Sequence, residues 1–183
     1  MDISPHSSPG MPAGRIFLTG FMGSGKTYWG SRWSQQYGLP FIDLDAEIER
    51  EEGKTIAALF EERGEAYFRQ QEAAWLRKRG GDHSFIMACG GGTPCFHNNM
   101  QWMNAQGITI YLQASAQQIY DRLVHEKDKR PLLKNTDAHS LQTFIEDKLA
   151  EREPFYRQAS YVIPVNELHL ESLSALDKQT RNA

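Results

Sequence analysis

The sequence predicts an α/β domain in which helices cover both faces of a parallel five-stranded sheet. Two observations support this prediction. Short apolar runs alternate with segments of helical periodicity, which is typical of parallel strands joined by right-handed helical crossovers. A glycine-rich loop also follows the first run directly and opens the next helix. The expected strands are residues 16–19, 40–45, 85–89, 108–112 and 161–165.

The chain of 183 residues is long enough for one domain with a substantial core. Its net charge of −3 gives no indication of a nucleic-acid or membrane partner, and no apolar run approaches the length of a membrane span. The N-terminus lacks the basic and apolar segments of a signal peptide. Cys89 and Cys95 have no metal-ligand spacing and are expected to be free thiols. We therefore expect a cytoplasmic protein.

The segment from Gly20 to Thr27 has the pattern G-x-x-x-x-G-K-T between a strand and a helix. Its glycines let several backbone N–H groups converge on one anion, and the following helix adds the positive end of its dipole. Lys26 is placed to reach the β- and γ-phosphates of a nucleotide, and the Thr27 hydroxyl to bind Mg2+. The alternative is a glycine-rich turn that binds nothing. We expect the ATP contacts here to be Gly23, Ser24, Gly25, Lys26, Thr27 and Tyr28.

Two carboxylates, Asp43 and Asp45, stand at the end of the second expected strand. Residues two apart in an extended segment point to the same side, so both would face one place near the magnesium-binding loop. The alternative is helix capping, because Asp is a frequent N-cap residue and Asp45 precedes a helical segment. The pair by itself does not decide between these two interpretations.

A helix is expected to begin after Thr55, to break at Gly64 and to resume over residues 65–79. Arg69 lies at the edge of the apolar face of its second part. By spacing alone, a surface ion pair with Glu72 is favoured for this arginine over contact with a ligand.

Three consecutive glycines, Gly90, Gly91 and Gly92, follow the third expected strand. Such a run costs considerable chain entropy, so we expect the backbone to approach another group closely there. An ordinary flexible loop is the alternative. Cys89, just before the glycines, is expected to pack in the interior rather than to react.

The last third of the chain begins with a charged loop, residues 125–133, which is either a solvated connector or a mobile lid whose arginine closes over phosphates. An amphipathic helix follows from residue 140 to about 153, and Pro154 would kink or end it. Pro164 cannot donate a ladder hydrogen bond, which indicates an edge strand. Residues 1–13, rich in Ser, Pro and Gly, are expected to be a disordered tail, with residues 14–183 as a single domain.

Together, these motifs resemble those of the shikimate kinase family. The glycine loop alone is shared with many nucleotide-binding proteins, whereas the paired aspartates, the Phe-Arg dipeptide and the triple glycine are much more discriminating. The matching segments, in family order, are 20–27 (GFMGSGKT), 41–45 (FIDLD), 64–69 (GEAYFR), 90–92 (GGG), 130–133 (RPLL) and 152–156 (REPFY). The resemblance implies a P-loop fold like that of nucleoside monophosphate kinases, with three layers and sheet order 2-3-1-4-5. It also implies a substrate-binding region at about 43–80 and a mobile lid at about 124–136.

The family's activity is transfer of the γ-phosphoryl group of ATP to the 3-hydroxyl of shikimate, a step of aromatic amino-acid synthesis by way of chorismate. The resemblance therefore implies ATP and shikimate as ligands and Mg2+ as cofactor. We expect the protein to act as a monomer, without nucleic-acid or membrane partners.

The resemblance also assigns roles to individual residues. Lys26, Asp45 and Arg130 would be catalytic, with Asp45 orienting the reacting hydroxyl or accepting its proton and Arg130 arriving on the lid. Thr27 and Asp43 would hold Mg2+, Asp43 through water. Arg122 and Arg130 would contact the nucleotide phosphates. The expected substrate contacts are Asp45, Arg69, Gly90, Gly91, Gly92 and Arg152.

In this interpretation Arg69 and Arg152 hold the substrate carboxylate, which favours a ligand role for Arg69 over the ion pair. Two other functions remain open. A related small-metabolite kinase, such as a gluconate kinase, would use the same loop without needing this pair of arginines. A nucleotide-binding module without catalysis would have no need of Asp45.

Overall fold

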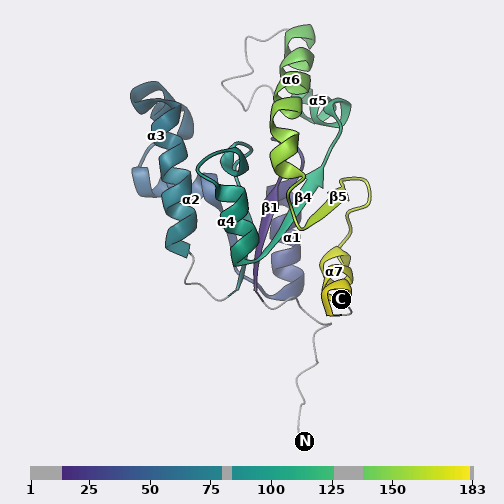
Figure 1. Ribbon diagram of the computed structural model, residues 1–183. Helices are drawn as coiled ribbons and strands as arrows, with labels where there is room; N and C mark the ends of the chain where they lie inside the picture. Colours follow the sequence, from purple (N-terminus) through teal and green to yellow (C-terminus); the bar gives the residue numbers. More distant parts are fainter. Residues whose placement is uncertain (1–13, 80–83, 126–137, 182–183) are drawn as a thin grey trace, which may run out of the picture.

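The computed structural model describes residues 14–79, 84–125 and 138–181, and these residues form a parallel sheet with strand order β2-β3-β1-β4-β5 (Figure 1). The order agrees with the expected one and places β5, which contains Pro164, at an edge. The strands are β1 (Arg15–Thr19), β2 (Phe41–Asp43), β3 (Phe85–Ala88), β4 (Ile108–Gln113) and β5 (Tyr161–Pro164).

Helices lie on both faces of the sheet, with α4 in front and α1 behind in Figure 1. Helices α2 and α3 stand beside the β2 edge, and α5 and α6 rise above the opposite half. The helices are α1 (Lys26–Tyr37), α2 (Leu44–Glu52), α3 (Ile56–Lys78), α4 (Asn99–Gln106), α5 (Ala116–His125), α6 (Ala138–Tyr156) and α7 (Ser172–Arg181), and a short 3-10 helix, η2, spans Thr93–Cys95.

The core has two parts because successive residues of β1 point to opposite faces of the sheet. Ile16 and Leu18 pack with Trp33 of α1 and with residues of α5, α6 and α7. Phe17 packs on the other face with residues of α2, α3 and α4. The central strand is therefore buried on both sides, and its carboxyl end leads straight into the glycine-rich loop.

The start of α3 and its interruption follow the predicted signals, and α5 also begins with capping hydrogen bonds. Thr55 caps α3 by accepting a hydrogen bond from the amide of Ala58, and Gly64 interrupts the helix with a φ of 79° and a ψ of 168°. Ser115 and Gln118 form reciprocal hydrogen bonds at the start of α5, as a capping box does.

Two local expectations need correction. Strand β2 ends at Asp43 and α2 begins at Leu44, so Asp45 lies in the first turn of a helix and not at the end of a strand. Helix α6 continues through Pro154 to Tyr156, so this proline does not end it. Tyr156 is fully buried and its ring lies 5.1 Å from that of Tyr111, and this packing holds the last turn of α6 in place.

Some expectations concern residues outside those described, namely the tail of residues 1–13 and Arg130 with most of the expected lid. Within the described ranges, no helix is both long enough and apolar enough to cross a membrane.

The join between α4 and β4 depends on Gly107. A Cβ atom there would lie 2.2 Å from the carbonyl oxygen of Arg15, a backbone atom at the start of β1. We predict that Gly107→Ala lowers the free energy of unfolding by roughly 1–3 kcal/mol, because β1 and β4 must separate locally. Urea unfolding of the variant and of the unaltered protein measures the difference.

Gly53→Ala is the control for the Gly107 variant. Gly53 has a φ of 64° in open space at the end of α2, so its replacement costs only the left-handed conformation, roughly 1 kcal/mol. The steric explanation is wrong if Gly107→Ala destabilises the protein no more than Gly53→Ala does.

Candidate active site

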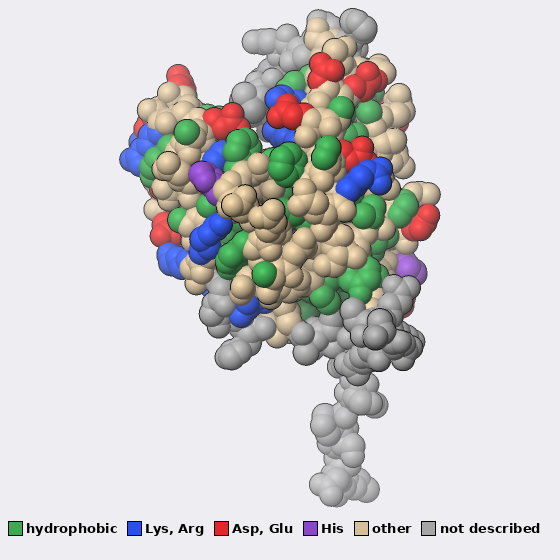
Figure 2. Space-filling view, in the orientation of Figure 1, with side chains coloured by type: hydrophobic (Ala, Val, Ile, Leu, Met, Phe, Trp, Pro, Cys, Tyr) green, Lys and Arg blue, Asp and Glu red, His purple; other side chains and the backbone are tan. Residues whose placement is uncertain are grey.

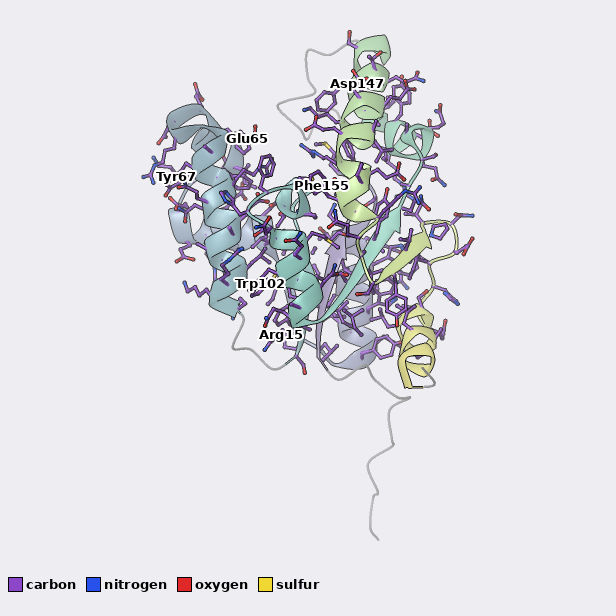
Figure 3. The ribbon with its side chains drawn as sticks, in the orientation of Figure 1. Arg15, Glu65, Tyr67, Trp102, Asp147 and Phe155 are labelled. Atoms are coloured by element: carbon purple, nitrogen blue, oxygen red, sulfur yellow. The ribbon has the colours of Figure 1, made fainter. Side chains whose placement is uncertain are left out.

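A cavity of about 630 Å3 lies at the carboxyl ends of β1, β2 and β3. Its walls come from the glycine-rich loop and the start of α1, from Asp43 and Asp45, from Gly90 and Gly91, and from Arg122. The molecular surface is notched between α3 and α6, where acidic and basic side chains gather (Figure 2). Arg15, at the amino end of β1, marks the opposite end of the sheet (Figure 3).

The loop before α1 is shaped to hold an anion. Gly20, Gly23 and Gly25 all have positive φ angles, which a residue with a Cβ adopts only at a cost. Gly25 precedes α1 without a side-chain cap, so the first amide groups of the helix are left for a ligand. The Ser24 hydroxyl is buried within the loop and has no hydrogen-bond partner. These features fit a bound phosphate group.

Two cationic side chains donate hydrogen bonds to carbonyl groups of this loop. The Lys26 ammonium group donates to the carbonyl oxygens of Gly20 and Phe21 at 2.8 and 2.9 Å. The Arg122 guanidinium donates to the Gly23 carbonyl at 2.8 Å from α5. Both charges therefore lie at the phosphate-binding loop, as expected from the sequence. Tyr28, another expected ATP contact, lines the cavity and is 57% exposed.

Thr27 and Asp43 lie in direct contact. The Thr27 hydroxyl donates to Asp43 Oδ2 at 2.8 Å, and Asp43 Oδ1 accepts the amide of Ala46 at 3.3 Å as the cap of α2. The capping role considered for Asp45 therefore belongs to Asp43. A hydroxyl and a carboxylate oxygen are the hard ligands that Mg2+ prefers, usually together with phosphates and water. Across the described ranges no group of three or more His, Cys, Asp or Glu could hold a metal ion. Thr27 and Asp43 supply two oxygen atoms, which fits an ion that is also bound by phosphates and water.

Asp45 is a half-buried residue, but its Oδ1 atom is buried and has no hydrogen-bond partner. Burial, followed by repulsion from Glu72 and Asp43, raises the pKa of Asp45 to about 7, although Lys26 and Arg69 oppose the shift. A pKa near neutrality suits a group that exchanges a proton with a substrate. The first turn of α2, rather than the end of β2, aims this side chain at the cavity.

Arg69 is only 7% exposed. Its Nη1 donates to Glu72 Oε2 at 2.7 Å, and its Nη2 donates to Glu65 Oε1 at 2.8 Å. The ion pair with Glu72 favoured by spacing is therefore present, but it is buried and not on the surface. Glu65 lies on the side of α3 that faces α6, whereas Tyr67 lies on the outer side (Figure 3). Arg69 is thus held on the side of α3 next to the site.

The three glycines after β3 each meet a different side chain of the site. A Cβ at Gly90 would lie 2.7 Å from Asp45 Oδ1 and 2.6 Å from Glu72 Oε1. A Cβ at Gly92 would lie 2.5 Å from the Arg69 guanidinium carbon, and one at Gly91 would lie 3.4 Å from Arg152 Nη1. The close backbone approach expected for this run is therefore present. The structure brings Arg69 and Arg152 to neighbouring glycines from α3 and α6.

Sequence reasoning missed two buried groups at the glycine wall formed by Gly90, Gly91 and Gly92, namely Thr93 and Tyr156, and it placed Glu72 on the surface. Glu72 has no exposed surface, and its carboxylate accepts the Thr93 hydroxyl as well as Arg69. Tyr156 donates to the Gly91 carbonyl at 2.5 Å and so fixes that peptide. Their positions carried weak signals, since Thr93 directly follows the glycines and Tyr156 ends the REPFY segment. Only the packing of α3 and α6 against η2 shows what these side chains touch.

Known proteins are similar to this chain over most of its length. A sequence model of the shikimate kinase family matches residues 22–177. Curated shikimate kinases of Bacteroides fragilis and Bacteroides thetaiotaomicron are 43% and 42% identical over 154 residues, which is 84% of this chain and 86% and 88% of theirs. This chain belongs to the shikimate kinase family.

Solved structures agree with membership of the shikimate kinase family. The shikimate kinase of B. thetaiotaomicron has a TM-score of 0.84 and 38% identity, covering 93% of this chain and 99% of that chain. The shikimate kinase of Acinetobacter baumannii in complex with shikimate has a TM-score of 0.79 and 31% identity, covering 95% and 94%. A gluconokinase of Sinorhizobium meliloti 1021, at 18% identity and a TM-score of 0.58, shares the fold.

The pKa of Asp45 generates a prediction for stability. The unfolded chain loses this proton near pH 3.8, whereas the folded protein keeps it until about pH 7. Between these pH values the folded state binds more protons than the unfolded chain. The contribution of Asp45 to the free energy of unfolding therefore falls as the pH rises, and it is lost above about pH 7. Asp45→Asn removes this titration. Its free energy of unfolding, relative to the unaltered protein, should therefore rise by roughly 2–4 kcal/mol from pH 4 to pH 8.

Denaturant unfolding in metal-free buffer across this pH range measures the effect. Asp121→Asn, on the exposed surface of α5, serves as the control for the loss of one carboxylate charge. A flat difference for Asp45→Asn would mean that its carboxyl group titrates as a solvated one does.

Proposed function

We infer that this chain is an ATP-dependent shikimate kinase, which converts shikimate and ATP into shikimate 3-phosphate and ADP. The observation that carries this conclusion is the placement of Asp45, whose buried Oδ1 has no hydrogen-bond partner, between a phosphate-binding loop and two arginines. A binding-only protein has no need of that group. Family membership over most of the chain supports the same activity.

On the phosphate side, we propose that the ATP phosphates take over the hydrogen bonds that now close the loop. Lys26 would leave the carbonyl groups of Gly20 and Phe21 for the β- and γ-phosphates, and Ser24 would gain the partner that its hydroxyl lacks. Arg122 would neutralise charge from the side of α5. We assign Arg130 the same task from outside the described residues. Phosphoryl transfer depends on such in-line positioning and charge neutralisation more than on covalent catalysis.

Thr27 and Asp43 would hold Mg2+ at the edge of this loop. Their oxygen atoms already face each other at 2.8 Å, and the Asp43 carboxylate is fixed by its bond to the start of α2. When bound there with ATP, magnesium neutralises developing charge on the transferred group. The protein's own contribution is to keep one hydroxyl and one carboxylate at the phosphate site.

On the acceptor side, we propose that Asp45 orients the 3-hydroxyl of shikimate and accepts its proton as the oxygen attacks the γ-phosphorus. Arg69 and Arg152 would bind the substrate carboxylate, since a guanidinium offers a planar pair of donors that matches a carboxylate. Gly90, Gly91 and Gly92 would let the ring approach the backbone between these groups.

We also propose that the protein acts as a monomer in the cytoplasm. All the described site groups come from one chain, so no residue of a second copy is required. Cys89 and Cys95 are both free thiols, as suits a reducing compartment.

The choice of acceptor tests the proposed function. A coupled assay of ADP release with magnesium and ATP should show turnover with shikimate, and background rates with quinate, gluconate or no acceptor. The physical reason is that the proposed site matches both the carboxylate and one hydroxyl of a ring of fixed shape. Turnover with gluconate alone would assign a different substrate. ATP binding without turnover on any acceptor would indicate a binding module.

Replacement of Arg69 tests the proposed carboxylate contact. Arg69→Ala should raise the KM for shikimate by an amount equivalent to roughly 2–4 kcal/mol, because a buried charged contact is lost. The KM for ATP should stay within about twofold of its original value. Steady-state kinetics with each substrate varied in turn separates the two effects.

Arg63→Ala is the matched control for the Arg69 variant. Arg63 lies on the same helix, but its guanidinium contacts Glu52 and Tyr67, and Tyr67 lies on the outer side of α3 (Figure 3). It should leave both KM values unchanged. An unaltered KM for shikimate in Arg69→Ala would mean that Arg69 does not bind the substrate and only forms its ion pair with Glu72.

A further inference from the structure

A line of hydrogen bonds leads from the start of α4 to Arg69. The Asn99 side chain accepts from Arg77 Nη1 through its Oδ1 at 2.8 Å and donates from its Nδ2 to the Thr93 carbonyl at 2.9 Å. The Thr93 hydroxyl donates to Glu72 Oε1, and Glu72 Oε2 accepts from Arg69 Nη1 at 2.7 Å. Helices α3 and α4 are thus joined through η2, next to the glycine wall.

The middle of this line is sealed from water. Asn99, Thr93 and Glu72 each have a relative exposure of 0%, and Arg69 has 7%. A buried polar group that loses its partner cannot turn to solvent, so its neighbours must shift to recover a hydrogen bond. A change at Asn99 is therefore passed to Thr93 and onward to Glu72 and Arg69.

The backbone between Thr93 and Asn99 also needs external support. His97 and Asn98 have φ angles of 51° and 55°, and such left-handed conformations outside glycine persist only where the surroundings hold them. Arg77 Nη2 donates to the His97 carbonyl at 2.9 Å. The Arg77 guanidinium also lies 5.7 Å from the ring of Trp102, which α4 carries (Figure 3).

This supported segment presents a ring to Arg69. The centroid of the Phe96 ring lies 4.8 Å from the Arg69 guanidinium carbon, and Phe96 directly precedes the left-handed residues His97 and Asn98. Arg69 is thus held by Glu72 through Nη1, and its guanidinium lies over the ring of Phe96. Both contacts depend on the same η2 segment, which Asn99 ties down from α4.

We propose that Asn99 is a positioning residue for recognition of the acid substrate. It fixes Thr93, Thr93 orients the Glu72 carboxylate, and Glu72 aims the guanidinium of Arg69 at the substrate carboxylate. Asn99 itself touches no substrate. This inference rests on the proposed function, because it takes Arg69 to bind that carboxylate.

The test is Asn99→Ala, measured in the full-length protein. The KM for shikimate should rise roughly 5- to 10-fold, the equivalent of one lost hydrogen bond, with kcat and the KM for ATP within about twofold. A merely structural role would move all three values together. Asn104→Ala is the matched control, since Asn104 is on the same helix and bonds Gln158 and Thr109, away from Arg69. It should leave the three values unchanged.

The methyl ester of shikimate provides a readout that depends on the carboxylate itself. With this neutral acceptor, Asn99→Ala and the unaltered protein should have the same kcat/KM, because there is no charge for Arg69 to bind. An equal loss with the acid and the ester would overturn the proposal. So would an unchanged KM for shikimate in a folded Asn99→Ala protein.

A second pair of variants keeps the test decisive if Asn99→Ala does not fold. Thr93→Val removes the hydroxyl that bonds Glu72 while keeping the side chain's shape, and Thr93→Ser restores it. The valine variant should show the raised KM for shikimate and the serine variant should recover the original value within about twofold. Equal KM values for the two variants would refute the connection.

Arg69→Ala, assayed alongside, separates failure of this inference from failure of the proposed carboxylate contact. If Arg69→Ala raises the KM for shikimate and Asn99→Ala and Thr93→Val do not, the positioning role is wrong and the contact stands. If Arg69→Ala has no effect, both are wrong. In the Arg69→Ala background, Asn99→Ala should add nothing, because the two changes act on one interaction.

Discussion

The site depends on the absence of side chains at Gly90, Gly91 and Gly92. Each position is approached so closely that a Cβ would collide with a charged group or press against one, from α2, α3 or α6. Three glycines cost chain entropy on folding, and this cost is offset by the close approach of charged side chains to their backbone. Helices α2, α3 and α6 can therefore bring carboxylates and guanidiniums together at the carboxyl ends of the strands.

Burial of opposite charges at this wall determines the chemistry of Asp45. Two carboxylates, Asp45 and Glu72, lie near Gly90, and burial with their mutual repulsion raises the pKa of Asp45. Arg69 compensates Glu72 directly at 2.7 Å, which leaves Asp45 without a dedicated partner. Asp45 can therefore bind a substrate hydroxyl without first breaking an ion pair. The two neighbouring acids therefore have unequal environments: Glu72 has a fixed ion pair, and Asp45 has a raised pKa.

Much of this organisation could be predicted from local patterns. The strand–loop–helix context of residues 15–37 identifies a phosphate-binding loop, and Pro164 marks an edge strand, because both signals act within a few residues. The prediction that Asp45 ends a strand is wrong because α2 begins at Leu44, two residues earlier than the sequence pattern indicates. The burial of Arg69 and the role of Asn99 had no local signal. They arise where α3, η2 and α4 pack together, and spacing along one helix cannot show such contacts.

The donors of Arg69 explain how one residue can pair with Glu72 and still bind an acid. A guanidinium has five N–H donors. The protein uses one on Nη1 for Glu72, and one on Nη2 and one on Nε for Glu65, so two remain, one on each terminal nitrogen. Two N–H donors are the number that a carboxylate accepts in a bidentate contact. The bond to buried Glu72 fixes the orientation, whereas Glu65 is 53% exposed and contributes little energy, so it can yield to a ligand. Lysine, with a single nitrogen, could not hold Glu72 and present a planar fork at the same time.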